Sequence, residues 1–214
     1  MLAGSDNNRT RFLLDRLSYL MRGSSVIILM EITSKKIVCF GGGTGLPALL
    51  SGLKHNPWLE ITAIVNVFDN GGSSGVLRDR YGILPPGDVL KCLLALSENE
   101  IAAREILLKR IEHATMPGHT GGNMLLLALQ AVYGSHEEAI HALGQILSIR
   151  GAVVPVSHQS STLCAEFVDA SQVQGETVVD GAIRNGKEIQ NLFLEPRVSA
   201  APAALAAIGR TDSF

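Results

Sequence analysis

The sequence predicts an α/β fold in which helices flank a parallel sheet, with a small β-rich segment after residue 150. Two apolar runs, at residues 36–40 and 61–68, have the length and composition of buried strands. A glycine-centred loop directly follows each run, and segments with helical periodicity come after the loops. This alternation of strand and helix is typical of a parallel sheet, because consecutive parallel strands need a crossover connection.

The other elements before residue 150 are predicted from apolar periodicity. A helix is expected over residues 47–54, where Pro47 suits the first turn because its missing N–H needs no partner there. After the second strand, helices are expected over residues 88–97, 101–113, 123–133 and 136–147.

After residue 150 the pattern changes to short strands. Residues 152–156, 163–168 and 176–179 are β-like runs, and Asp169-Ala170-Ser171 resembles a hairpin turn. A short helix is expected over residues 202–208. In a parallel α/β sheet such a helix normally leads to another strand. We therefore expect the domain over residues 35–214 to be incomplete at its C-terminal end.

Residues 1–34 are interpreted as an N-terminal extension. Apolar residues between positions 12 and 21 fall near helical spacing, with charged residues between them. One interpretation is an amphipathic helix that docks on a partner or a membrane surface. We favour an extension with no such role, because Met30 directly precedes a natural start of the domain and the segment is not strongly basic.

The composition excludes several classes of protein. Hydrophobic residues make up 46% of the 214 residues and charged residues 18%, so the chain can bury a core. A net charge of −2 without a long basic run argues against nucleic acid as a partner. No apolar stretch approaches the roughly 18 residues of a membrane span, and charged residues interrupt the stretch that a signal peptide would need.

The cysteines predict a reducing compartment. Cys39, Cys92 and Cys164 are far apart, odd in number and without metal-ligand spacing. Reduced core thiols are typical of cytosolic proteins. A cytoplasmic location is therefore expected.

The first loop, Gly41-Gly42-Gly43-Thr44-Gly45-Leu46, is a candidate phosphate-binding loop. Glycine lets backbone N–H groups approach an anion, and the following helix adds the positive end of its dipole. A dinucleotide fingerprint needs a third glycine, where this chain has Leu46. The alternative is a tight turn that binds nothing. We favour contact with phosphate, because a second glycine loop supports it.

The second loop carries more polar groups. Asp69 and Asn70 offer oxygen ligands at a strand end, and the glycines after them can form an anion nest. Arg78 can reach a phosphate, but no Gly-Lys-Ser/Thr closes a Walker A loop. A glycine-rich surface turn is the alternative. The candidate ligand contacts are Asp69, Asn70, Gly71, Gly72, Ser73, Ser74 and Arg78.

Two further segments add candidate residues. Residues 82–88 lead into a helix, and capping by Asp88 explains that residue about as well as ligand contact does. His119, in a glycine-flanked loop before the next apolar helix, can act as an acid, a base or a phosphate donor. Asn123 can cap that helix or hold a ligand. The other histidines show no metal spacing and are interpreted as surface or packing residues.

In combination, these four segments resemble the gluconeogenesis factor (YvcK-like) family and the related 2-phospho-L-lactate transferase (CofD) family. The resemblance covers about residues 36–210 and rests on the runs 38–46, 69–75, 82–88 and 118–123. It implies a Rossmann-like fold in which the first loop faces the nucleotide phosphates through Gly42, Gly43, Thr44 and Gly45. It also implies that Asp69 and residues 71–75 line the same cleft, and that His119 and Asn123 complete the other wall.

The resemblance implies two functions. The first, which we favour, is a cytosolic UDP-sugar-binding regulatory protein that supports growth on gluconeogenic carbon and controls cell shape. The second is a metal-dependent transferase that moves a phospholactyl group from a guanylylated donor. The family usually has two aspartates where this chain has Asp69 and Asn70, which weakens a Mg²⁺ site at Asp69. An NAD-binding oxidoreductase ranks lowest, and assembly into a homo-oligomer stays open.

Overall fold

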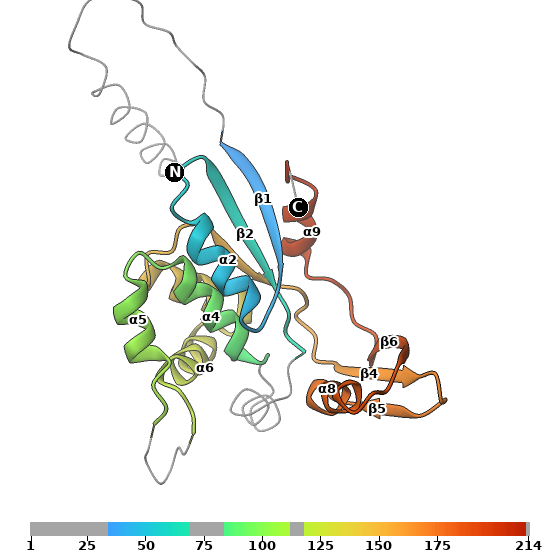
Figure 1. Cartoon of the computed structure of the whole chain (residues 1–214). Coiled ribbons are helices and arrows are strands. Elements are labelled where there is room, and N and C mark those ends of the chain that lie inside the picture. Colours follow the sequence, from blue (N-terminus) through green and yellow to red (C-terminus); the bar gives the residue numbers. More distant parts are fainter. Residues whose placement is uncertain (1–33, 69–83, 112–117, 213–214) are drawn as a thin grey trace, which may run out of the picture. The chain divides into compact units, whose positions relative to one another are not determined.

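A parallel sheet with the strand order β1-β2-β3 forms the centre of the fold. The computed structural model describes residues 34–68, 84–111 and 118–212 (Figure 1), all within one compact unit, Thr33–Phe214. The strands are β1 (Lys35–Gly41), β2 (Leu59–Val65) and β3 (Ala152–Pro155). The predicted parallel sheet is therefore confirmed. The predicted extension lies almost wholly outside the described residues and, like the expected incompleteness of the domain, stays a prediction.

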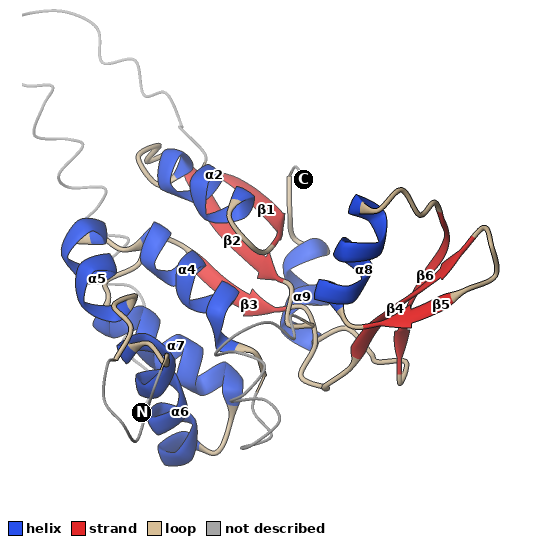
Figure 2. Cartoon of the chain, turned by 60° about the horizontal axis from the view of Figure 1, so that its bottom comes forward, coloured by secondary structure: helices blue, strands red, loops and turns tan. Residues whose placement is uncertain are grey.

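Helices cover both faces of this sheet. Side chains along a strand point alternately to the two faces, and apolar side chains on both faces pack against helices. On β2, Ile61, Ala63 and Val65 join a large core with helices on one face, whereas Ile64 packs with a helix on the other. The first face carries α2 (Gly45–Leu53), α4 (Pro86–Leu96) and α7 (His136–Ile146), with α5 (Glu100–Leu107) and α6 (Gly121–Tyr133) around α4. The second face carries α9 (Pro202–Ile208), as Figure 2 shows.

The central helix of this arrangement is α4. Leu90 and residues 92–96 of this helix are almost fully buried, as expected for a helix that is apolar nearly all round. The packing of these side chains in the core therefore sets the position of α4, including its first turn.

A second, antiparallel sheet has the order β5-β4-β6, with β4 (Thr162–Phe167), β5 (Gln172–Gln174) and β6 (Ile189–Glu195). The predicted hairpin turn at Asp169-Ala170-Ser171 is confirmed, since the Ser171 N–H and hydroxyl both donate to Asp169 Oδ1, at 3.1 Å and 2.5 Å. The predicted strand over residues 176–179 is wrong. These residues begin α8 (Glu176–Arg184), because Val179 and Ala182, three positions apart, pack together against this sheet.

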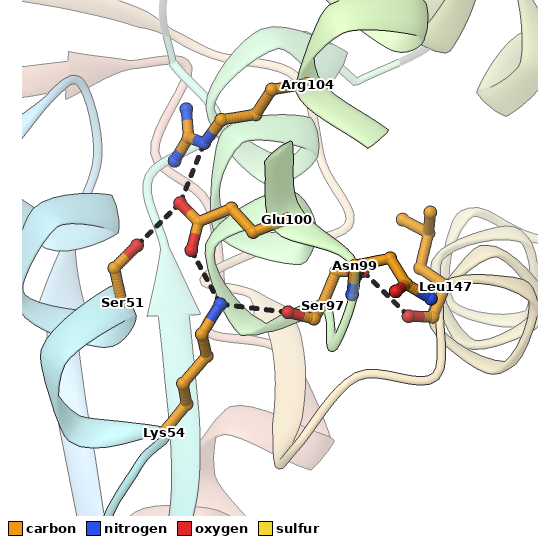
Figure 3. A network of polar contacts seen from close by, with 7 residues as sticks. All are labelled: Ser51, Lys54, Ser97, Asn99, Glu100, Arg104 and Leu147. Carbon is orange, nitrogen blue, oxygen red and sulfur yellow. Dashed lines mark hydrogen bonds and ion pairs between the residues drawn. The ribbon is translucent and has the colours of Figure 1, made fainter. Parts of the chain in front are cut away.

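Lys54 occupies a buried site where α2 and α4 end (Figure 3). Its ammonium donates to the Ser97 carbonyl at 2.9 Å and to Glu100 Oε2 at 2.6 Å. The other oxygen of Glu100 accepts from Ser51 and Arg104, each at 2.8 Å. Burial acts to raise the pKa of Glu100, but the hydrogen bonds from Lys54, Ser51 and Arg104 outweigh it and lower the pKa to about 2.

None of the helices in the described ranges is long and apolar enough to cross a membrane.

We expect the variant Lys54→Met to lower the free energy of unfolding by about 2–3 kcal/mol, because it leaves a partly buried carboxylate and a buried carbonyl short of a donor. Urea unfolding followed by circular dichroism measures this loss. The folded-state pKa of Glu100 lies below its ordinary value of 4.5. The contribution of this network is therefore complete above about pH 4.5 and is lost as the pH falls towards 2.

The matched control is Arg104→Met, since Arg104 binds the same carboxylate from a more exposed position. We expect a loss below about 1 kcal/mol for this variant. Equal losses for the two variants would contradict the assignment of Lys54 as the anchor of the network.

Candidate functional site

The first glycine loop joins β1 to α2 at the carboxyl edge of the parallel sheet. Gly43 has a φ of +59°, a left-handed conformation that glycine adopts without strain. Asn66, directly after β2, donates its N–H to the Gly41 carbonyl at 2.8 Å and holds the base of the loop. Ligands of open parallel sheets bind at this edge, so the loop lies where a phosphate site is expected.

Asp88 lies against this loop. It is in the first turn of α4, and its Oδ2 accepts a hydrogen bond of 2.6 Å from the Gly43 N–H. Lys91, one turn later, donates to Oδ1 at 2.9 Å, and Asp88 is only 8% exposed. Of the two roles predicted for Asp88, helix capping is wrong, whereas ligand contact stays a prediction. The helix begins two residues earlier than predicted, and Pro85 takes the N-cap position.

The glycines of the first loop have different surroundings. A Cβ on Gly42 would lie 2.6 Å from Asp88 Oδ2 and 3.3 Å from the Asn66 Cβ. A Cβ on Gly43 or Gly45 would have none of the described atoms within 4 Å. The tight approach of Asp88 therefore explains Gly42, whereas no neighbour in the described part of the chain explains the absence of a side chain at Gly43 or Gly45.

The start of α2 is the accessible part of the loop. Thr44 takes the N-cap position without a side-chain capping bond, and both Thr44 and Gly45 are exposed. The next residue, Leu46, is buried in the core, which explains why the position of the third fingerprint glycine holds a large apolar side chain. A helix N-terminus with exposed N–H groups can accept an anion.

The candidate residues of the fourth segment lie at the start of α6. Thr120, rather than Asn123, caps this helix, since its hydroxyl accepts the Asn123 N–H at 3.2 Å. Asn123 is buried in the first turn, and the His119 carbonyl accepts the Ile111 N–H at 2.7 Å. The α6 start packs on α4, because a Cβ on Gly122 would lie 2.4 Å from a Leu90 methyl group. That His119 and Asn123 form a wall of the ligand cleft stays a prediction.

The second glycine loop is not part of the described residues. The predicted roles of Asp69, Asn70, Gly71, Gly72, Ser73, Ser74 and Arg78, and of Asp69 as a Mg²⁺ ligand, therefore stay predictions. In the described ranges, no group of at least three histidine, cysteine or acidic side chains is placed to hold a metal ion.

One anchoring contact was not predicted. Nε2 of His136, at the start of α7, accepts the Leu84 N–H at 2.7 Å, just ahead of α4. Burial, and next the electrostatic effect of the neighbouring His158, lower the pKa of His136. The apolar pocket beside this contact holds about 20 Å³, room for one water molecule but not for a nucleotide. The two partners are 52 residues apart, so no local pattern indicates the contact.

Comparison with known proteins gives a consistent result. Residues 37–213 match the family model described as 2-phospho-L-lactate transferase CofD. The chain is 40% identical over 182 residues to the gluconeogenesis factor of Listeria innocua, covering 84% of this chain and 55% of the relative. It is 39% identical over 179 residues to the gluconeogenesis factor of Bacillus subtilis, with coverages of 83% and 55%.

A solved structure shares the fold. The crystal structure of a UPF0052 family protein from Bacillus halodurans superposes with a TM-score of 0.78 at 41% identity. The match covers 84% of this chain and 57% of that chain. The predicted family resemblance and Rossmann-like fold are confirmed, and the chain spans about half the length of the curated relatives it matches.

We expect Gly42→Ala to lower the free energy of unfolding by about 1–3 kcal/mol, because the added methyl group displaces either Asp88 or Asn66. Chemical denaturation measures the loss. Gly45→Ala is the matched control: its methyl group enters open space in a helix, where alanine is favoured over glycine by up to about 1 kcal/mol. Similar stabilities for the two variants would contradict the tight Asp88 packing.

We expect the free energy of unfolding to fall as the pH drops below about 6.5, the ordinary pKa of histidine. The folded-state pKa of His136 is lowered, so the unfolded chain binds more protons there. Protonation also removes the acceptor for the Leu84 N–H, a loss of about 1 kcal/mol. Denaturation between pH 7.5 and 5 measures the slope.

His136→Gln keeps an acceptor that does not titrate and should flatten this slope, whereas His141→Gln, an exposed position on the same helix, should leave it unchanged. An unchanged slope in His136→Gln would show that other groups cause the pH dependence.

Proposed function

The chain belongs to the CofD family, and from this premise we propose that it is a cytosolic nucleotide-sugar-binding regulatory protein that takes UDP-sugars. One observation carries the proposal: the start of α2 at the carboxyl edge of the sheet is exposed at Thr44 and Gly45, and none of the described atoms lies within 4 Å of a Cβ on Gly45. Backbone N–H groups and the helix dipole at such a position favour phosphate. The three cysteines are free thiols, which fits a reducing compartment.

The relatives support a regulatory role over a catalytic one. The similar proteins of Listeria innocua and Bacillus subtilis are both named gluconeogenesis factor, which points to carbon metabolism, and we extend this role to cell-shape control. The sequence offers Asp69 with a neutral neighbour, Asn70, as metal ligands. Because Mg²⁺ favours charged oxygen ligands, we propose that the UDP-sugar binds without a metal.

A second candidate is a transferase that uses a guanylylated donor. The description of the matching family model, 2-phospho-L-lactate transferase, favours it. This function requires Mg²⁺, with Asp69 as a ligand, and it predicts a preference for guanine nucleotides.

A thermal-shift panel tests these proposals, with UDP-N-acetylglucosamine, UDP-glucose, GDP and NADH, each with and without Mg²⁺. We expect a UDP-sugar at about 100 times its Kd to add about 2.7 kcal/mol of stability without Mg²⁺. A Mg²⁺-dependent response to GDP alone supports the transferase instead. No response to any nucleotide would contradict both functions.

Gly45→Ala locates the site within the same panel. Its methyl group meets none of the described atoms within 4 Å, so the variant should fold but should lose the UDP-sugar response if phosphate contacts the start of α2. An exposed alanine substitution on another element, Val178→Ala on α8, should keep the response. A full response of Gly45→Ala would show that the phosphate binds elsewhere.

A further inference from the structure

The carboxylate of Asp88 takes a position that a phosphate would otherwise use. Its Oδ2 lies 2.6 Å from the Gly43 nitrogen, the distance of a short, charge-assisted hydrogen bond. Phosphate oxygens at glycine-rich loops accept hydrogen bonds from backbone N–H groups of this kind. In the ligand-free protein the N–H of Gly43 is thus already bonded to an anion of the chain itself.

The loop is built around this carboxylate. The missing side chain of Gly42 makes room for Oδ2, because a Cβ there would approach it to 2.6 Å. Asp88 is nine-tenths buried, and it extends from α4, the most buried helix on this face. The carboxylate is therefore held in place by its surroundings and is not a side chain that happens to touch the loop.

Among the described residues, the charge of Asp88 is offset by Lys91, and only in part. Lys91 binds the other oxygen at 2.9 Å, but its side chain is 37% exposed, so solvent screens it more than it screens Asp88. A phosphate that approaches Gly43, or the neighbouring N–H groups of Thr44 and Gly45, meets a negative charge at close range.

We infer that Asp88 competes with the ligand's phosphate for the Gly43 N–H and sets how much negative charge the loop accepts. The inference rests on the proposed function and deepens it. A UDP-sugar carries one negative charge on each phosphate, whereas free UDP ends in a phosphate with a second ionisation. The Asp88 carboxylate therefore disfavours UDP more than a UDP-sugar, and selects a ligand whose terminal phosphate is esterified.

The test compares Asp88→Asn with the wild-type chain by titration calorimetry with UDP and UDP-glucose, and by ligand-observed NMR with uridine. Asparagine keeps an oxygen acceptor for the Gly43 N–H and removes the charge. We expect the Kd of UDP to fall about tenfold, that of UDP-glucose to fall less, and that of uridine to stay the same. Asp180→Asn, the same change at an exposed position on α8, should alter none of the three.

Each other outcome has a definite meaning. Weaker UDP binding in Asp88→Asn would show that Asp88 braces the ligand-bound loop, and would overturn the inference while the proposed function stands. An equal gain for uridine would show an effect through the fold and would also overturn it. Absence of nucleotide binding in both the wild-type chain and the variant would overturn the proposed function, and the inference with it.

Lys91→Gln is a second variant that keeps the inference testable if Asp88→Asn does not fold. Lys91 is partly exposed, and its loss removes the cation that pairs with Asp88 in the described part of the chain. UDP binding should weaken several-fold, and UDP-glucose binding less, because UDP carries more charge. Equal losses for both ligands, or tighter UDP binding, would contradict the inference.

Discussion

The fold around the candidate site depends on two clamps between α2 and α4. At the ends of both helices, the buried ammonium of Lys54 bonds to the Ser97 carbonyl and the Glu100 carboxylate. At their starts, the Gly43 N–H bonds to Asp88. A buried ammonium without partners would be strongly unfavourable. The C-terminal ends of α2 and α4 therefore have few alternative arrangements that keep Lys54 paired. Since the helices are joined at both ends and packed in one core, the position of the loop ahead of α2 depends on the position of α4.

The first clamp also reaches the last strand of the parallel sheet. The hydroxyl of Ser97 donates to the Leu147 carbonyl at 2.9 Å, and the Arg150 N–H donates to the Leu96 carbonyl at 2.9 Å. The segment that enters β3 is thereby attached to the end of α4. One polar cluster thus joins α2, α4 and the segment that enters β3 (Figure 3), although residues 51 and 147 are far apart in the sequence.

The sequence was sufficient for the features that local patterns encode. The parallel strands, the helices on the apolar face and the hairpin turn at Asp169 follow from periodicity and turn chemistry within short windows. Local patterns gave a wrong prediction at residues 176–179. The β-branched residues there suggest a strand, but apolar residues at helical spacing over the longer segment place these residues in α8. The contacts of the site could not be predicted in this way. Gly43 and Asp88 are 45 residues apart and Leu84 and His136 are 52 apart, so their pairing depends on tertiary packing.

Glycine in a loop motif does not by itself mark a ligand contact. In the run Gly42-Gly43-Thr44-Gly45, the first glycine is explained by a carboxylate of the same chain, the second by its left-handed backbone, and the last by neither. None of the described atoms lies within 4 Å of a Cβ built on Gly45, so the described residues do not account for this glycine. Under the proposed function, a ligand phosphate at the start of α2 would account for it, and the negative charge of Asp88 would limit which phosphate binds there.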